Sequence, residues 1–261
     1  MKEFMTLLKK SVFSPIMLIT ILIGMVLLLY PIYPDIVAAL RYYEKRPVYL
    51  YYIIIMHSVG VFDLFAPVLA ALPGSSIYYD DLHRNSIFYI LSRTNRIRYI
   101  VLRLAVCSIS GGLALLCPIT FLTILSLICG KAYVPNDDIN LFADTCMNNI
   151  QYVADGVLIL IILLMLSFIF GALWSMIGMT FSSYIENKFT PYAAPFMAYF
   201  GISMLLAQSD TALKFSPINM LFPNYHNIPS ISFCFLYQII IYIFAIVIFY
   251  LKANWRLKNE L

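Results

Sequence analysis

Long apolar stretches dominate this sequence, and shorter segments that carry charge separate each stretch from the next. A helix rises about 1.5 Å per residue, so roughly 20 consecutive apolar residues cross the hydrocarbon core of a bilayer. The alternation of apolar and polar residues that is typical of strands does not persist anywhere, and no internal repeat is visible. The sequence therefore predicts an all-α, polytopic membrane protein, a single domain over residues 1–261, with six transmembrane helices at about 15–33, 51–72, 99–129, 156–180, 191–206 and 231–251.

The composition excludes an ordinary soluble domain. Hydrophobic residues make up 62% of the chain and charged residues only 11%, whereas about a quarter of a typical globular domain is charged. The 20 Tyr and 19 Phe suit a membrane protein, because Tyr is enriched at membrane–water interfaces. The five cysteines are odd in number and form no Cys-x-x-Cys pair, so we expect neither a disulfide framework nor a metal site. No basic patch of the kind that binds nucleic acid is present.

The first 13 residues place apolar and charged side chains on opposite faces of a helix. This pattern predicts an interfacial amphipathic helix over residues 1–13, lying along the membrane surface before the chain turns at Pro15. The alternative is that these residues are only the positive flank of the first span. No small-residue cleavage site follows the first apolar run, so we expect a retained helix and not a signal peptide.

Lysine and arginine are distributed unevenly between the two sides of this six-span arrangement. The segments on the side of the termini hold 12 of the 17 basic residues. Cytoplasmic loops of membrane proteins carry the excess of Lys and Arg. The sequence therefore predicts that both termini are cytoplasmic.

The longest polar interruption on that side is Leu72–Arg103, between the second and third spans. It predicts a short amphipathic helix after Asp80, followed by a turn at Ser92–Asn95, where Thr94 or Asn95 caps the next helix. Such a helix is too short to cross a bilayer, so it lies at the membrane surface or docks into another protein. Its apolar face comprises Leu82, Ile87, Phe88 and Leu91, and its charged residues are Asp80, Asp81, Arg84 and Arg93.

Two arginines stand at the start of the third span, Arg96 and Arg98. The helix dipole disfavours a cation there by about 0.3–1 kcal/mol, and anionic lipid favours it by about 1 kcal/mol. Because the two effects nearly cancel, we expect these arginines to serve topology or a protein partner.

Asp63 is the one carboxylate near the middle of a predicted span. An ionised Asp at that depth costs about 2.5–3.5 kcal/mol, so it has to face the bundle interior, a wet cavity or a partner. Two interpretations stand equal: a polar element of a translocation path or helix pairing, and a satisfied or protonated structural residue.

Small residues on two spans permit close approach of helices, at Gly111 and Gly112 on the third and at Gly171, Ala172 and Ser175 on the fourth. We take them as support for a dimer.

The sequence carries no catalytic or nucleotide-binding motif. The phosphate-binding loop, the His-Glu-x-x-His zinc motif, the Gly-x-Ser-x-Gly elbow and the calcium-binding loop are all missing. We therefore expect no catalytic residues and no cofactor in this chain, and any nucleotide hydrolysis has to come from a separate subunit.

Residues 66–104, APVLAALPGSSIYYDDLHRNSIFYILSRTNRIRYIVLRL, resemble the region between the second and third helices of bacterial type-2 ABC exporter permeases. Those proteins have an apolar helix, an acidic residue, a short helix that ends in Leu-x-Arg or Leu-x-x-Pro, and then Arg and Tyr leading into the next helix. Asp80 or Asp81 matches the acidic position, and Leu91-Ser92-Arg93 the end of the short helix. Arg96 and Tyr99 match the start of the next span, with Arg103 where a Lys is common.

The resemblance implies a membrane-spanning permease subunit in a bacterial plasma membrane. Residues 74–98 would hold a cytoplasmic coupling helix, and Tyr79–Arg96 would be the main contact with an ABC ATPase subunit, which would carry ATP and Mg²⁺. The turn Ser182–Phe189 would be a secondary contact at most. A second permease copy or a paralogue would complete the complex, and the apolar spans favour an amphipathic or hydrophobic cargo such as an antimicrobial peptide, a drug or a lipid-like molecule.

Two other functions stay open from the residues alone. A stand-alone channel or secondary transporter needs inverted repeats, broken helices or several charges within the membrane, and Asp63 is the one such charge found. A non-transporting membrane sensor or assembly protein would use the Leu72–Arg103 stretch to bind its partner. A neighbouring gene for an ATPase with a phosphate-binding loop would favour the exporter.

Overall fold

The computed structural model describes residues 2–42, 60–83, 86–129, 156–222 and 230–259. Within these ranges every regular element is a helix, as the sequence predicts. In chain order the elements are α1 (Lys2–Val12), α2 (Pro15–Tyr42), α4 (Gly60–Ala71), α5 (Ile77–His83), α6 (Ser86–Leu91), α7 (Arg96–Cys129), α9 (Gly156–Tyr184), α10 (Thr190–Leu206), α11 (Asp210–Leu213), the 3₁₀ turn η1 (Pro217–Asn219) and α12 (Ile231–Asn259).

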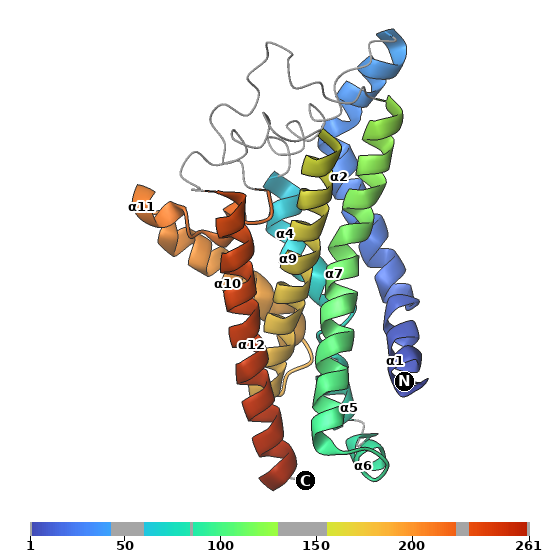
Figure 1. Cartoon of the computed structure of the whole chain (residues 1–261), viewed down its shortest axis with the longest axis vertical. Coiled ribbons are helices and arrows are strands. Elements are labelled where there is room, and N and C mark those ends of the chain that lie inside the picture. Colours follow the sequence, from blue (N-terminus) through green and yellow to red (C-terminus); the bar gives the residue numbers. More distant parts are fainter. Residues whose placement is uncertain (1, 43–59, 84–85, 130–155, 223–229, 260–261) are drawn as a thin grey trace.

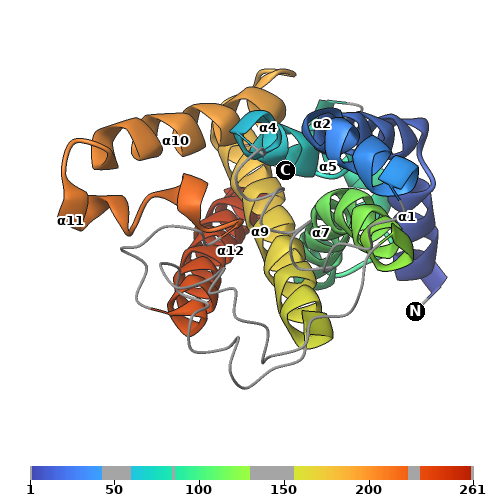
Figure 2. The same cartoon turned by 90° about the horizontal axis from the view of Figure 1, so that it is seen from above.

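Four helices in the described part of the chain are long and apolar enough to cross a membrane. Their qualifying segments are Pro15–Pro34, Arg96–Leu125, Leu160–Tyr184 and Ile231–Asn259. The other two predicted spans are represented by shorter apolar helices. The described part of the second is the 12 residues of α4, about 18 Å long, and the fifth is the 17 residues of α10, about 26 Å long. In Figures 1 and 2, α10 runs obliquely to the other long helices.

The helix α9 lies at the centre of the bundle. It packs against α7, α12, α10 and α4, and both views place it between α7 and α12. Its inward face contributes the fully buried Leu163, Leu166 and Phe170 to the main apolar core. Helices on the outside expose large apolar side chains instead, among them Leu22 and Val26 on α2 and Ile240 and Phe244 on α12. An apolar surface of this extent is what a bilayer covers.

The helices α7 and α9 meet at glycine. A Cβ atom on Gly171 would stand 2.4 Å from the carbonyl oxygen of Gly111, and one on Gly111 would stand 2.7 Å from that of Gly171. One turn away, the Ser175 hydroxyl donates to the backbone carbonyl of Cys107 at 3.2 Å. The small residues that the sequence analysis assigned to a dimer contact therefore bring two helices of the same chain together.

Both termini lie at one end of the bundle, with α5 and α6 beside them (Figure 1). The predicted N-terminal helix is present as α1, which packs against α7. Ser14 begins the next helix, because its hydroxyl accepts the backbone N–H of Met17 at 3.1 Å and Pro15 occupies the first helical position. This arrangement puts the predicted docking stretch and both chain ends on one side.

Candidate functional site

The connection between α4 and α7 forms two short helices. The sequence analysis predicted one helix after Asp80, whereas α5 begins at Ile77 and a second helix, α6, begins at Ser86. The turn predicted at Ser92–Asn95 is present. The Thr94 hydroxyl donates to the carbonyl of Ile90 at 2.7 Å and so closes α6, while the Asn95 carbonyl accepts the first hydrogen bond of α7, from the Tyr99 N–H at 2.9 Å.

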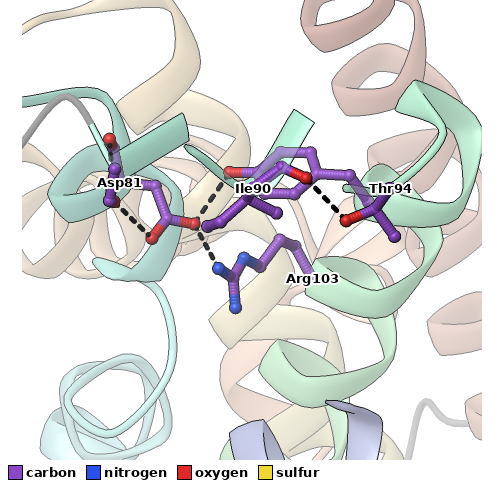
Figure 3. Close-up of polar contacts among 6 residues, drawn as sticks. Asp81, Ile90, Thr94 and Arg103 are labelled. Atoms are coloured by element: carbon purple, nitrogen blue, oxygen red, sulfur yellow. Dashed lines mark hydrogen bonds and ion pairs between the residues drawn. The ribbon is translucent and has the colours of Figure 1, made fainter. Parts of the chain in front are cut away.

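A buried ion pair fixes this connection to α7. Arg103 Nη2 lies 2.6 Å from Asp81 Oδ2, and Figure 3 shows the two side chains pointing toward each other. The hydroxyl of Tyr99 donates to the same Asp81 oxygen at 2.8 Å. Ser86, at the start of α6, donates to the backbone carbonyl of Asp81 at 3.2 Å and approaches its Oδ1 at 3.3 Å. Asp81 thus joins α5, α6 and α7.

The ion pair is shielded from solvent. The side chain of Arg103 is 4% exposed and that of Asp81 is 14% exposed. Two buried charges stabilise a fold only when their desolvation is offset by good geometry and further hydrogen bonds. Asp81 has those bonds from Tyr99 and Ser86. Arg103 has the Tyr99 ring, whose centroid lies 5.1 Å from its guanidinium carbon.

An apolar cluster holds the other side of the connection. Tyr78 on α5 and Ile87 on α6 are fully buried. The Tyr78 ring packs edge-on against Phe249 of α12, with 5.1 Å between the centroids. The same cluster includes Met176 and Met179 of α9. The connection therefore contacts α7 through the ion pair and shares an apolar cluster with α7, α9 and α12.

The predicted docking residues fall into two groups. Asp81 points inward, and Leu82 and Leu91 pack on the apolar cluster. Tyr79 stacks on His83 with 3.9 Å between ring centroids, and Asp80 accepts the Ser76 hydroxyl at 3.2 Å. Arg84 lies outside the described residues. The exposed group consists of Phe88, which is 49% exposed, and the side chains of Arg93 and Arg96; the neighbouring Tyr89, which is 78% exposed, was not among the predicted docking residues.

The sequence analysis missed the roles of Tyr99 and Arg103. They stand four residues apart, so they share one face of α7, and a cation one turn inside an apolar span calls for a carboxylate partner. Asp80 and Asp81 precede this span and could supply that carboxylate, although the sequence does not say which of the two turns inward.

Asp63 lies on α4, which packs against α9 and α10. Its Oδ1 is buried and has no hydrogen-bond partner among the described residues. On the facing helices, the buried polar atoms Trp174 Nε1, Tyr199 Oη and Ser203 Oγ are also without a partner in that part of the chain. Trp174 and Tyr199 touch edge to face, with 5.2 Å between ring centroids.

The described residues bring together no three His, Cys, Asp or Glu side chains that could hold a metal ion. No protein-family model, curated protein or solved structure matches this chain. The geometry of the α4–α7 connection and of the apolar helices is therefore the basis for assigning a function.

Proposed function

We propose that this chain is the membrane-spanning permease subunit of a bacterial ABC exporter, with six spans and both termini in the cytoplasm. The observation that carries the proposal is the α5–α6 connection, a packed element at the end of the bundle where both termini lie, joined to α4 and α7 and fixed by Asp81 and Arg103. The four long apolar helices support a location in the plasma membrane.

The proposed role of α5–α6 is to transmit movement of an ATPase subunit to the spans. A contact transmits movement only if the element is rigid and attached to the parts that move. The ion pair to Arg103 attaches α5 to α7, and the contact of Tyr78 with Phe249 attaches it to α12. A push on the α5–α6 connection would therefore reach α7 and α12 through these contacts of α5.

The exposed side of α6 is the proposed docking surface. Phe88 and Tyr89 offer apolar area, and Arg93 and Arg96 add positive charge at its edge. Aromatic residues and Arg are enriched among the side chains that dominate binding energy in protein interfaces. Because Leu91 packs partly into the chain's own cluster, Phe88 and Tyr89 are better docking residues than Leu91.

The complete exporter would contain two permeases, identical or paired with a paralogue, and two ATPase subunits that bind ATP and Mg²⁺. The Gly111–Gly171 crossing is used within one chain, so the contact between permeases would use other helices. The apolar composition of the spans favours an amphipathic or hydrophobic cargo, such as a peptide, drug or lipid-like molecule.

The experiment uses the permease co-purified with the ABC ATPase that associates with it, reconstituted in vesicles. We expect Phe88→Ala to leave the amount of inserted protein unchanged and to lower transport per ATP hydrolysed by about fivefold or more, since truncating an interface anchor costs upwards of about 1 kcal/mol. The matched control is Phe189→Ala, which removes an aromatic ring that is 71% exposed on the turn between α9 and α10.

Equal coupling in Phe88→Ala and Phe189→Ala would refute the docking assignment. Crosslinks from the ATPase to that turn or to the termini, and none to Tyr79–Arg96, would do the same. If no ATPase associates with the chain at all, the exporter proposal itself fails.

A secondary transporter is the second candidate, and the buried polar atoms around Asp63 favour it. A transporter needs groups of this kind near the middle of the membrane to bind a polar substrate or an ion. Transport that continues without ATP but stops in Asp63→Asn would support this candidate over the exporter.

A further inference from the structure

An apolar groove of about 500 Å³ lies between α9, α10 and α12. Its volume falls within the range of about 300–1,000 Å³ that is usual for ligand sites. The walls include Trp174 and Ile177 of α9, Ala198 and Ile202 of α10, and Ala245 and Ile248 of α12. None of these residues belongs to the Asp81–Arg103 site.

Lys252 lies next to the lining residue Tyr184 at one end of the groove. On α12 the lining residues recur at helical spacing through Ala245 and Ile248, and the next residue on that face is Lys252. On α9 the lining face ends at Tyr184. The Lys252 ammonium nitrogen lies 5.2 Å from the centroid of the Tyr184 ring and 4.6 Å from that of the Trp255 ring. The two walls thus converge on a cation at the end of the bundle that holds the termini.

Among the described residues, no carboxylate lies within ion-pair distance of the Lys252 ammonium group, and Glu186, at the same end, is paired with Arg256. Both rings beside Lys252 are of the kinds that gather where a protein meets the lipid headgroups. Charge and aromatic side chains therefore mark this end of the groove as the membrane interface.

The length of the groove suits one leaflet. The α9 wall runs from Phe170 to Tyr184, which is about 21 Å at 1.5 Å per residue. Half of the hydrocarbon core of a bilayer measures about 15 Å. A molecule whose charged group sits at Lys252 can therefore extend a chain along the whole depth of the leaflet on the side of the termini.

We propose that this groove binds an anionic glycerophospholipid, with one acyl chain between α9, α10 and α12 and the phosphate group beside Lys252. An acyl chain is the apolar ligand that every bilayer supplies, and the headgroup provides a negative charge, which no described residue places within ion-pair distance of Lys252. The site is independent of the proposed transport role, so a measurement of lipid binding alone tests it.

Tryptophan fluorescence of the full-length purified chain tests the site. The sequence holds two Trp, so Trp255→Phe, which keeps an aromatic ring beside Lys252, leaves Trp174 in the groove wall as the single reporter. This variant is mixed with phosphatidylcholine vesicles of two series. One series contains rising fractions of phosphatidylglycerol with brominated acyl chains, and the other contains rising fractions of phosphatidylcholine with the same brominated chains. The bromine atoms quench Trp fluorescence on contact. Since one basic residue at an anionic surface contributes about 1 kcal/mol, we expect phosphatidylglycerol to reach half-maximal quenching at about fivefold lower fraction.

Three further variants make the test specific. In the same background, Lys252→Ala should abolish the headgroup preference, Lys252→Arg should keep it, and Ala198→Phe should fill the groove and reduce quenching by both lipids. The matched control is Lys258→Ala, which removes an exposed charge from the same helix and should leave the preference intact. Equal quenching by the two headgroups, unquenched Trp174, or equal effects of Lys252→Ala and Lys258→Ala would overturn the proposal.

Discussion

Two connections in the described part of the chain join apolar helices at the end where the termini lie, and they are held in different ways. The connection from α4 to α7 is anchored by the buried pair of Asp81 and Arg103. The turn from α9 to α10 is anchored by the ion pair of Glu186 and Arg256, and the Glu186 side chain is 56% exposed. Each connection uses one carboxylate and one guanidinium, so the difference in burial decides how much each ion pair contributes to stability.

The physical basis of the difference is solvation. Water competes little for a carboxylate that is 14% exposed, so removing its cation leaves an uncompensated buried charge. An exposed carboxylate regains water when it loses its partner. The first connection should therefore act as one packed unit with α7, and the second should tolerate change.

The largest effect is expected for Arg103→Ala. This change leaves the Asp81 side chain, which is 14% exposed, without its cation, and we expect it to lower the free energy of unfolding by about 3–5 kcal/mol. Thermal unfolding of the detergent-solubilised protein measures the loss. The double variant Asp81→Leu with Arg103→Met should recover most of it, because no charge is left buried. If Arg103→Ala is as stable as the original protein, the ion pair of Asp81 and Arg103 is not buried.

A smaller effect is expected for Tyr99→Phe. The substitution keeps the ring beside Arg103 and removes only the hydroxyl that donates to Asp81 at 2.8 Å. Hydrogen bonds to charged groups contribute about 1.5–3 kcal/mol, so the loss of stability should fall in that range. The control is Tyr89→Phe on α6, whose side chain is largely exposed and which should unfold like the original protein.

The smallest effect is expected for Glu186→Gln. Exposed ion pairs contribute about 0–1 kcal/mol and are screened by salt, so the change in unfolding free energy should be within 1 kcal/mol and should shrink further at about 1 M salt. A loss as large as that of Arg103→Ala would show that the second connection is as firmly held as the first, and the contrast between them would disappear.

Hydropathy predicted the long helices well and their ends less well. The predicted sixth span stops at about residue 251, whereas α12 continues through Lys252, Arg256 and Lys258 to Asn259. A hydropathy pattern marks where a helix meets lipid, and backbone hydrogen bonds carry the helix beyond that boundary. The helix-ending turn at Ser92–Asn95 was predictable because Ser, Thr and Asn compete for backbone hydrogen bonds there.

The candidate site was predictable in place but not in detail. The sequence located the polar stretch and its apolar and charged residues, but it treated Asp81 as part of a docking surface. Which carboxylate turns inward depends on how α6 folds back toward α7, a tertiary property that periodicity does not encode. The glycines show the same limit, since Gly111 and Gly171 predict a close contact without naming the partner helix.

The glycine crossing also restricts where this molecule can open. With the backbones of α7 and α9 in direct contact at Gly111 and Gly171, these two helices have no side chains there that could slide over one another, and they should tilt as one rigid body. Any opening that admits a molecule from the bilayer must then occur at a looser junction. One looser junction in the described part of the chain is that of α10 with α12, where the structure leaves about 500 Å³ unfilled beside α9.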